Sequence, residues 1–179
     1  MAEIKLTKNE LRDQQKKLEQ LEKFLPVMQL KKAMLQEEVL MAHQEINALL
    51  EQHQDSLQKI DGLRGLMNDL EAIDLEGAAR VRTVKKRFEN IAGIEVPYLE
   101  SVEFEPFSYD LFDTAAWTDG AILIWQKAMT LQAAIVVAQE KKDILEKELR
   151  EVSIRVNLFE KVLIPKTTSH IKKIKIFLA

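Results

Sequence analysis

The stretch LRDQQKKLEQLEKFLPVMQLKKAMLQEEVLMAHQEINALLEQHQDSLQKIDGL (Leu11–Leu63) decides the fold, because its apolar residues recur at alternating intervals of three and four. Twelve of the sixteen positions in this seam are apolar, over more than seven heptads: Leu11, Gln14, Leu18, Leu21, Leu25, Met28, Lys32, Leu35, Val39, Ala42, Ile46, Leu49, His53, Ser56, Ile60 and Leu63. Such a repeat keeps one helix face against a partner helix as the two supercoil. We therefore expect residues 1–63 to form a coiled-coil helix.

Residues 119–179 contain a second seam with the same spacing, broken only by Lys142: Ala121, Ile124, Ala128, Leu131, Ile135, Ala138, Lys142, Leu145, Leu149, Val152, Val156, Phe159 and Leu163. Two seams of similar length within one chain favour an intramolecular antiparallel pair that buries both. Parallel homodimerisation is the alternative, but the connection would then have to carry the chain back along the full rod. Near Pro165 the apolar stripe moves by one residue, to Ile164, which predicts a kink or a re-phased helix.

The segment between the two helices, residues 64–118, differs in composition. Apolar residues at helical spacing predict a short helix that ends near Gly77: Leu66, Met67, Leu70 and Ile73. Partial alternation in Arg80–Ile91 and Ile94–Phe104, separated by Ala92-Gly93, predicts a β-hairpin. At 55 residues the segment is too long for a loop, so we expect a small knob at the closed end of the rod, rich in aromatic residues: Phe104, Phe107, Tyr109 and Phe112. The predicted fold class is mostly α, a long antiparallel two-helix coiled coil with this knob.

Composition excludes several classes of protein and site. Five glycines and four prolines in 179 residues, about 5% against roughly 12% in average usage, are too few for all-β or Rossmann-type folds. There is no cysteine, no glycine-rich phosphate loop and no Ser/His/Asp arrangement, so we expect a chain without cofactor or catalytic residues. His43, His53 and His170 do not have metal-ligand spacing, so no metal site is expected. The longest apolar runs are far short of the roughly 20 residues of a membrane span, and the start lacks an apolar leader, which predicts a cytoplasmic protein.

Charge is distributed unevenly along the chain. The net charge of −3 predicts no attraction to nucleic acid, but residues 1–32 together with 161–179 carry +8 and the remainder carries −11. Residues 88–126 contain eight acidic residues and no lysine or arginine. The folded-back arrangement would then be basic at the open end and acidic at the knob. Two ends that meet different partners are one explanation, and accidental clustering on a solvated surface is the other.

A second apolar stripe lies off the seam, at a heptad position that faces water in a two-helix coil. Its members are Val27, Met34 and Met41 on the first helix, and Leu123, Val137, Ile144 and Leu158 on the second. We expect a bound protein on this flank, with Met34, Met41, Val137 and Ile144 as its contacts. A wider seam or an oligomer contact is the alternative.

Three passages resemble the D subunit of V-type and A-type rotary ATPases. RVNLFEKVLIP (155–165), followed by IKKI (171–174), resembles the C-terminal signature of that family. LTKNEL (6–11) with LKKAML (30–35) is similar to its N-terminal helix, and NIAGIEVP (90–97) to its central hairpin. Leu6 stands where the family often has proline, and relatives commonly continue beyond the position of Ala179.

The resemblance implies a central rotor shaft that transmits torque and is not itself an enzyme. Its termini would enter the catalytic hexamer of A and B subunits, the F subunit would bind its flank, and the knob would face the membrane ring through a connecting subunit, without membrane insertion. Candidate hexamer contacts are Lys161, Lys166, Ile171, Lys172, Lys173, Ile174 and Lys175. A free-standing coiled-coil adaptor is the competing class, and it leaves the hairpin and the aromatic knob unexplained. An ATP-using enzyme is disfavoured by the missing nucleotide loop.

Overall fold

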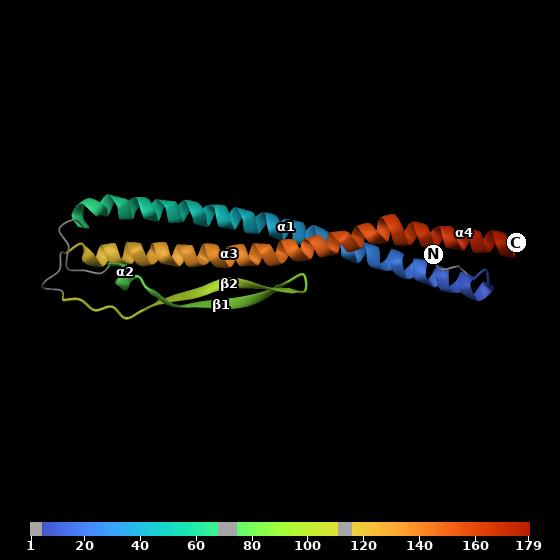
Figure 1. Cartoon of the computed structure of the whole chain (residues 1–179), viewed down its shortest axis with the longest axis horizontal. Helices are drawn as coiled ribbons and strands as arrows, with labels where there is room; N and C mark the ends of the chain where they lie inside the picture. The colour runs from blue at the N-terminus through green and yellow to red at the C-terminus, as the bar shows by residue number, and fades with distance from the viewer. Residues whose placement is uncertain (1–4, 68–74, 111–115) are drawn as a thin grey trace. The chain divides into compact units, whose positions relative to one another are not determined.

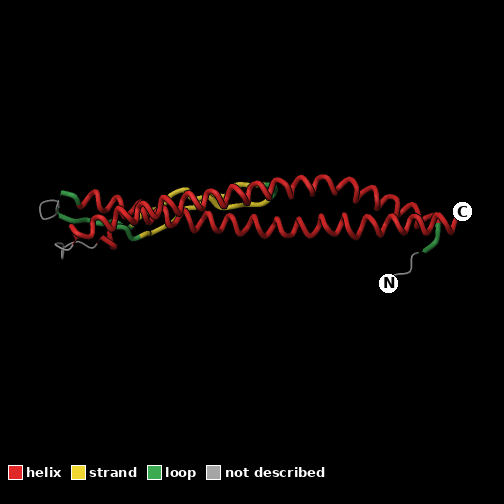
Figure 2. Tube along the Cα trace, turned by 90° about the horizontal axis from the view of Figure 1, so that it is seen from above, coloured by secondary structure: helices red, strands yellow, loops and turns green. Residues whose placement is uncertain are grey.

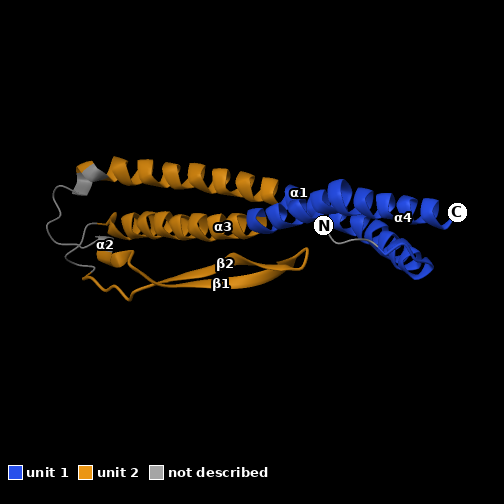
Figure 3. Cartoon of the chain, turned by 45° about the vertical axis from the view of Figure 1, so that its right-hand side comes forward, with its two compact units in different colours: residues 1–38, 146–179 blue, residues 39–145 orange. Residues whose placement is uncertain are grey.

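The computed structural model describes residues 5–67, 75–110 and 116–179 (Figure 1). Its elements, in chain order, are α1 (Lys8–Met67), α2 (Leu75–Ala78), β1 (Val81–Ile91), β2 (Ile94–Phe104), α3 (Thr118–Leu158), a π-helical turn η1 (Phe159–Leu163) and α4 (Ile164–Leu178). The chain divides into two compact units, the terminal unit of residues 1–38 and 146–179 and the central unit of residues 39–145 (Figure 3). Both long helices contribute to both units.

Burial along α1 follows the predicted seam. All sixteen seam positions from Leu11 to Leu63 are buried or half-buried, and the other residues of that range are exposed apart from Lys31 and Glu38, which are half-buried. Leu35 is fully buried. The helix continues through Pro26 without a break. The heptad pattern, rather than local propensity, therefore sets the orientation of this helix about its own axis.

The second seam is buried in the same way along α3 and η1, since none of its thirteen positions is exposed. In the terminal unit, Lys31 Nζ lies 2.8 Å from Glu148 Oε1 and Gln29 bonds Glu160. In the central unit, Lys141 Nζ lies 2.9 Å from Glu45 Oε2. The N-terminal helix thus packs antiparallel on the C-terminal helices, which confirms the predicted fold class.

The one-residue shift of the stripe near Pro165 has a structural cause. In the π-turn η1, the Ile164 N–H donates to the carbonyl of Phe159, five residues back instead of four. A π-turn inserts one extra residue into a helix. The seam accordingly resumes one position later and then continues in α4 with Thr167, Ile171 and Ile174, all buried. Pro165 lies at the start of α4, where its missing N–H is tolerated.

The predicted hairpin is confirmed almost residue for residue. β1 and β2 pair antiparallel from Val81 opposite Phe104 to Ile91 opposite Ile94. Ala92 and Gly93 have φ angles of 52° and 84°. Two positive φ values define the type I′ turn that joins tightly twisted strands. The Gly93 N–H donates to Asn90 Oδ1 at 3.0 Å, which supports the turn.

The position of the hairpin differs from the prediction of a knob at the closed end. β1 and β2 lie alongside α3, as Figures 1 and 2 both show. Lys86 of β1 bonds Glu140 of α3, well beyond the first residues of that helix. The hairpin folds back because off-seam apolar residues of α3 give it a surface to pack on. As for the short helix predicted near residues 66–77, α1 continues to Met67 and α2 begins at Leu75, while Leu70 and Ile73 lie outside the described residues.

This packing accounts for the apolar composition of α3. By length and composition, the helical stretch Thr118–Leu178 contains an 18-residue window, of mean hydropathy 1.5, that is apolar enough to cross a membrane. This window is apolar on average, although the uninterrupted apolar runs of the chain are far shorter than the roughly 20 residues of a membrane span. Along α3, however, one face packs on α1 and another on the hairpin, as buried Leu145 and Val137 illustrate. A helix covered on two faces needs more apolar residues than one with a single seam.

Candidate interaction surfaces

The basic end of the terminal unit consists of exposed lysines on η1 and α4. Lys161, Lys166, Lys172, Lys173 and Lys175 are all exposed, and none forms an ion pair with a residue in the described part of the chain. Ile171 and Ile174, predicted as contacts beside them, are buried in the seam. The surface that α4 offers to a partner is therefore cationic up to Lys175, because its seam residues are buried, and it becomes apolar at Ile176 and Phe177.

His170 lies within this cationic surface. Partial burial lowers the pKa of its imidazole, and the nearby charges of Lys166, Lys173 and Lys17 lower it further, while Glu10 opposes them. Three lysines around one imidazole make a second cation unfavourable there. His170 consequently adds no positive charge to this surface near neutral pH.

Exposed apolar side chains accompany the lysines, and the sequence pattern predicted only some of them. Phe24, Val27 and Leu30 of α1 are exposed, as are Ile154 and Leu158 of α3 and Val162 of η1. At the end of α4, the exposed fractions of Ile176 and Phe177 are 78% and 64%. Large apolar side chains clustered off a satisfied seam are typical of protein contact surfaces. In the sequence, all of these residues are recognisable as apolar residues outside the seam. Only Val27 and Leu158 also belong to the second apolar stripe, which repeats every seven residues.

The four predicted flank contacts lie in different environments. Met34 in the terminal unit and Met41 in the central unit are exposed, and Ile144 is half-buried. Val137, in contrast, is only 3% exposed, because it packs beneath the hairpin. The hairpin therefore explains Val137 without a separate protein, and the two methionines remain available to one.

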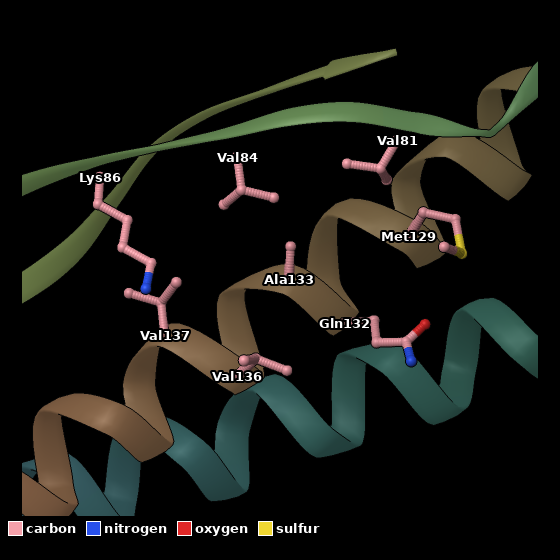
Figure 4. Close-up of a pocket in the computed structure, with 8 residues that line it drawn as sticks. All are labelled: Val81, Val84, Lys86, Met129, Gln132, Ala133, Val136 and Val137. Atoms are coloured by element: carbon pink, nitrogen blue, oxygen red, sulfur yellow. The ribbon is translucent and has the colours of Figure 1, made fainter. Parts of the chain in front are cut away.

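A pocket of about 340 Å³ separates part of the hairpin from α3 (Figure 4). Val81, Val84 and Lys86 of β1 line one side, and Met129, Gln132, Ala133, Val136 and Val137 of α3 line the other. In Figure 4, Val84 and Ala133 point toward one another across the gap. The hairpin thus contacts α3 through an incompletely filled apolar interface.

Polar contacts hold the hairpin at the two ends of this interface. Near its base, Gln126 Nε2 donates to the carbonyl oxygen of Ala78 at 2.9 Å. Farther along, Lys86 bonds Glu140, and the next residue of α3, Lys141, reaches both Glu45 of α1 and the ring of Tyr98 in β2. Burial by itself lowers the pKa of Lys141, but hydrogen bonds to Glu45 and Tyr98 outweigh it and leave that pKa raised. Lys141 is consequently a cation throughout the physiological pH range.

Comparison with known proteins assigns the chain to a family. The ATP synthase D subunit family matches residues 10–179. The V-type ATP synthase D subunit of Chlamydia abortus is 40% identical over 179 residues, covering 99% of this chain and 86% of the relative. The subunits of the same name from Chlamydia felis and Chlamydia muridarum are 41% and 42% identical, with 86% and 88% of each relative covered. This chain belongs to the ATP synthase D subunit family.

As a member of the D subunit family, the protein is part of a V/A-type ATPase, a complex associated with a membrane and built with other ATPase subunits. The D subunit is a structural part of that complex, and no group of three or more potential metal ligands occurs in the parts of the chain that the structure describes.

The hairpin of this D subunit is less acidic than its sequence window suggested. Two basic residues in or next to β1 form ion pairs with acidic residues in or next to β2: Lys85 Nζ lies 2.5 Å from Glu103 Oε1, and Arg80 lies 3.7 Å from Glu105 Oε2. The hydrogen bond and charge of each partner raise the pKa of Lys85 and lower the pKa of Glu103. A hairpin places residues that are distant in sequence side by side. Two of the eight acidic residues of the 88–126 window, Glu103 and Glu105, are thus paired with basic residues that precede that window.

The aromatic residues predicted for the knob follow β2. Phe104 ends that strand and is half-buried, and the rings of Phe107 and Tyr109 lie 5.8 Å apart at 38°. A tilted pair at this distance has a favourable stacking geometry. Phe112 lies outside the described residues. Phe107 and Tyr109 thus form a local aromatic contact in this part of the protein.

Proposed function

We propose that this chain is the central rotor shaft of its V/A-type ATPase. It transmits torque between the catalytic hexamer of A and B subunits and the ion-translocating ring in the membrane, and so couples ATP hydrolysis or synthesis to ion transport. The chain catalyses nothing itself. It works in the cytoplasm, peripheral to the membrane, and reaches the ring through a connecting subunit. Residues 1–63 and 119–179 act as the shaft helices, and residues 64–118 as the part next to the ring.

The single observation that carries this proposal is the unbroken burial of both seams, in a chain that belongs to the D subunit family. A coiled coil resists bending because side chains of each helix insert between those of the other along its length. Even at Pro165 the seam is kept, since the π-turn restores its phase. A shaft packed along its whole length has no segment that would bend or unwind first when torque is applied.

Grip on the hexamer is supplied by the terminal unit. Five exposed lysines provide attraction to acidic groups of the A and B subunits, and exposed apolar side chains such as Phe24 and Phe177 provide packing. The F subunit binds the flank, where Met34, Met41 and Ile144 supply contacts. Both kinds of surface lie on helices and are therefore rigidly displayed.

An affinity pull-down of the tagged chain from its native cells, followed by mass spectrometry, tests the proposed partners. The A, B and F subunits should be recovered together. Recovery of none of them from cells that contain the assembled ATPase would contradict the rotor role and favour the free-standing adaptor.

Charge reversal tests the proposed grip. Lys172→Glu combined with Lys173→Glu should weaken hexamer binding and uncouple ATP hydrolysis at low salt, because exposed charges act most strongly there. Lys147→Glu, an exposed lysine on α3 in the same unit, is the matched control. Unchanged affinity and coupling in the double variant would remove these lysines from the interface.

Polar substitution tests the flank. Met41→Ser with Ile144→Ser should weaken binding of the purified F subunit in a titration while the helical circular dichroism signal is retained. Equal affinity for the variant and the parent chain would exclude these two residues as contacts.

A further inference from the structure

The central unit contains a buried cation on α3 that contacts both α1 and the hairpin. Lys141 of α3 is only 6% exposed. Its Nζ donates to Glu45 Oε2 of α1 at 2.9 Å and lies 4.2 Å from the centre of the Tyr98 ring in β2. A buried ammonium group is stable only where partners replace its lost hydration. Here one partner comes from the other helix and the second from the hairpin.

Two cations lie close to the ring of Tyr98. Besides Lys141, the guanidinium of Arg87 lies 5.6 Å from the ring centre, and Arg87 is opposite Tyr98 in the hairpin register. Cations attract the face of an aromatic ring, and the attraction increases when water is excluded. The Tyr98 ring therefore interacts with both Lys141 of α3 and Arg87 of β1. These contacts hold β2 next to Lys141.

The residue before Lys141 contacts the other strand. Glu140 bonds Lys86 of β1, so two consecutive residues of α3 with opposite charges hold both strands of the hairpin. The second attachment, between Gln126 and Ala78, lies fourteen residues earlier on α3, about 21 Å at 1.5 Å per residue. Between the two attachments lies the incompletely filled apolar pocket. Apolar packing alone therefore does not fix the position of the hairpin on α3 precisely.

We propose that Lys141 is the positioning residue that fixes the hairpin to both helices, at the centre of a clamp formed with Glu45, Tyr98 and the Glu140–Lys86 pair. The clamp makes the hairpin turn with the two helices as one body. Without it, the hairpin remains attached at its base and moves relative to α3. Anchoring is an intramolecular property measured on the isolated chain, so its failure would leave the rotor role untouched.

Hydrogen exchange of the full chain, followed by mass spectrometry, tests the clamp. Lys141→Met keeps the apolar stem and removes the ammonium group, and it should accelerate amide exchange in β2 about tenfold or more, as expected for the loss of a charge-assisted contact. Exchange in the seam of the terminal unit should be unchanged. Lys127→Met, at an exposed lysine of the same helix, is the matched control and should leave β2 unaffected. Wild-type exchange rates in Lys141→Met would overturn the proposal.

Two further sets of variants separate the clamp from general loss of folding. Tyr98→Phe keeps the ring over Lys141 but removes the hydroxyl bond to it, so its exchange rate should lie between those of the parent and Lys141→Met, whereas Tyr98→Leu should resemble Lys141→Met. Lys86→Glu and Glu140→Lys should each accelerate exchange in β1, and together they should restore it. Failure of the combined variant to restore exchange would remove this pair from the clamp.

Spin labels provide a readout that stability alone does not change. The chain has no native cysteine, so Glu95→Cys in β2 and Gln139→Cys in α3 can be labelled selectively. The distance distribution between them should be narrow in the parent chain and in Lys127→Met, and clearly broader in Lys141→Met. An equally narrow distribution in Lys141→Met would mean that the hairpin is positioned by its other contacts.

Discussion

The terminal and central units build on the same pair of long helices but cover them differently. In the terminal unit the described elements are all helical, and off-seam apolar residues such as Phe24 and Ile154 remain exposed. In the central unit a hairpin lies on α3 and buries Val137. An off-seam apolar residue therefore has two possible explanations, an intramolecular cover or a partner protein. The central unit shows the first, and the uncovered surface of the terminal unit favours the second.

Seam residues should be equally important in both units, and their loss should have the largest effect on stability. Leu35→Ala in the terminal unit and Leu145→Ala in the central unit each remove a fully buried side chain, so each should lower the free energy of unfolding by about 2–5 kcal/mol. Urea denaturation followed by circular dichroism measures this. The exposed control Ile154→Ala should change stability by less than about 0.5 kcal/mol. A large effect of the control would show that the terminal unit covers this residue after all.

Off-seam substitutions should distinguish the units. Val137→Ala removes buried contacts beneath the hairpin and should destabilise the central unit by about 1.5–3 kcal/mol. Leu158→Ala, in the terminal unit, should leave the free energy of unfolding nearly unchanged but weaken binding to the A/B hexamer. Thermal unfolding and hexamer titration measure the two effects. If Leu158→Ala lowered the free energy of unfolding, or if Val137→Ala left it unchanged, off-seam residues would not differ in role between the two units.

The hairpin turn offers a change in the opposite direction. Ala92 has a left-handed backbone with φ of 52°, which disfavours a residue with a Cβ atom, whereas asparagine tolerates this conformation and is preferred in type I′ turns. Ala92→Asn should therefore stabilise the hairpin by about 0.5–1 kcal/mol. Slower amide exchange in β1 and β2 would confirm this, and the seam of the terminal unit serves as the internal control. Faster exchange would mean that the turn tolerates alanine better than its φ angle implies.

A smaller effect concerns pH and is confined to the terminal unit. The folded-state pKa of His170 is lowered by burial and by nearby lysines, so the unfolded chain binds more protons at this site. Stability should therefore fall as pH decreases through the unfolded-state pKa of about 6.5 toward the lower folded-state value. His170→Gln should reduce this pH dependence without changing stability at pH 8. An unchanged slope between pH 7 and pH 5 in urea titrations would assign the dependence to other groups.

Much of the fold could be predicted because it depends on local patterns. The heptad spacing identified every buried seam position of α1, and the Ala92-Gly93 pair located the hairpin turn. The shift from Leu163 to Ile164 was visible as a change of phase, although a kink at Pro165 and a π-turn before it produce similar patterns. Contact surfaces were harder to predict. Ile171 and Ile174 were expected to face a partner, yet the same spacing that made them conspicuous places them in the seam.

The sequence by itself determined the two seams and the strands of the hairpin, since periods of 3.5 and 2 residues depend on neighbouring positions alone. It favoured antiparallel pairing of the seams over a parallel homodimer, and the structure decided between the two. Only the tertiary structure decided where the hairpin lies and which off-seam residues it covers. It also decided that Lys85 pairs with Glu103 and that Lys141, Glu45 and Tyr98 meet. These arrangements join residues many positions apart, so no repeat in the chain encodes them. They follow from packing and charge pairing once the helices and strands have formed.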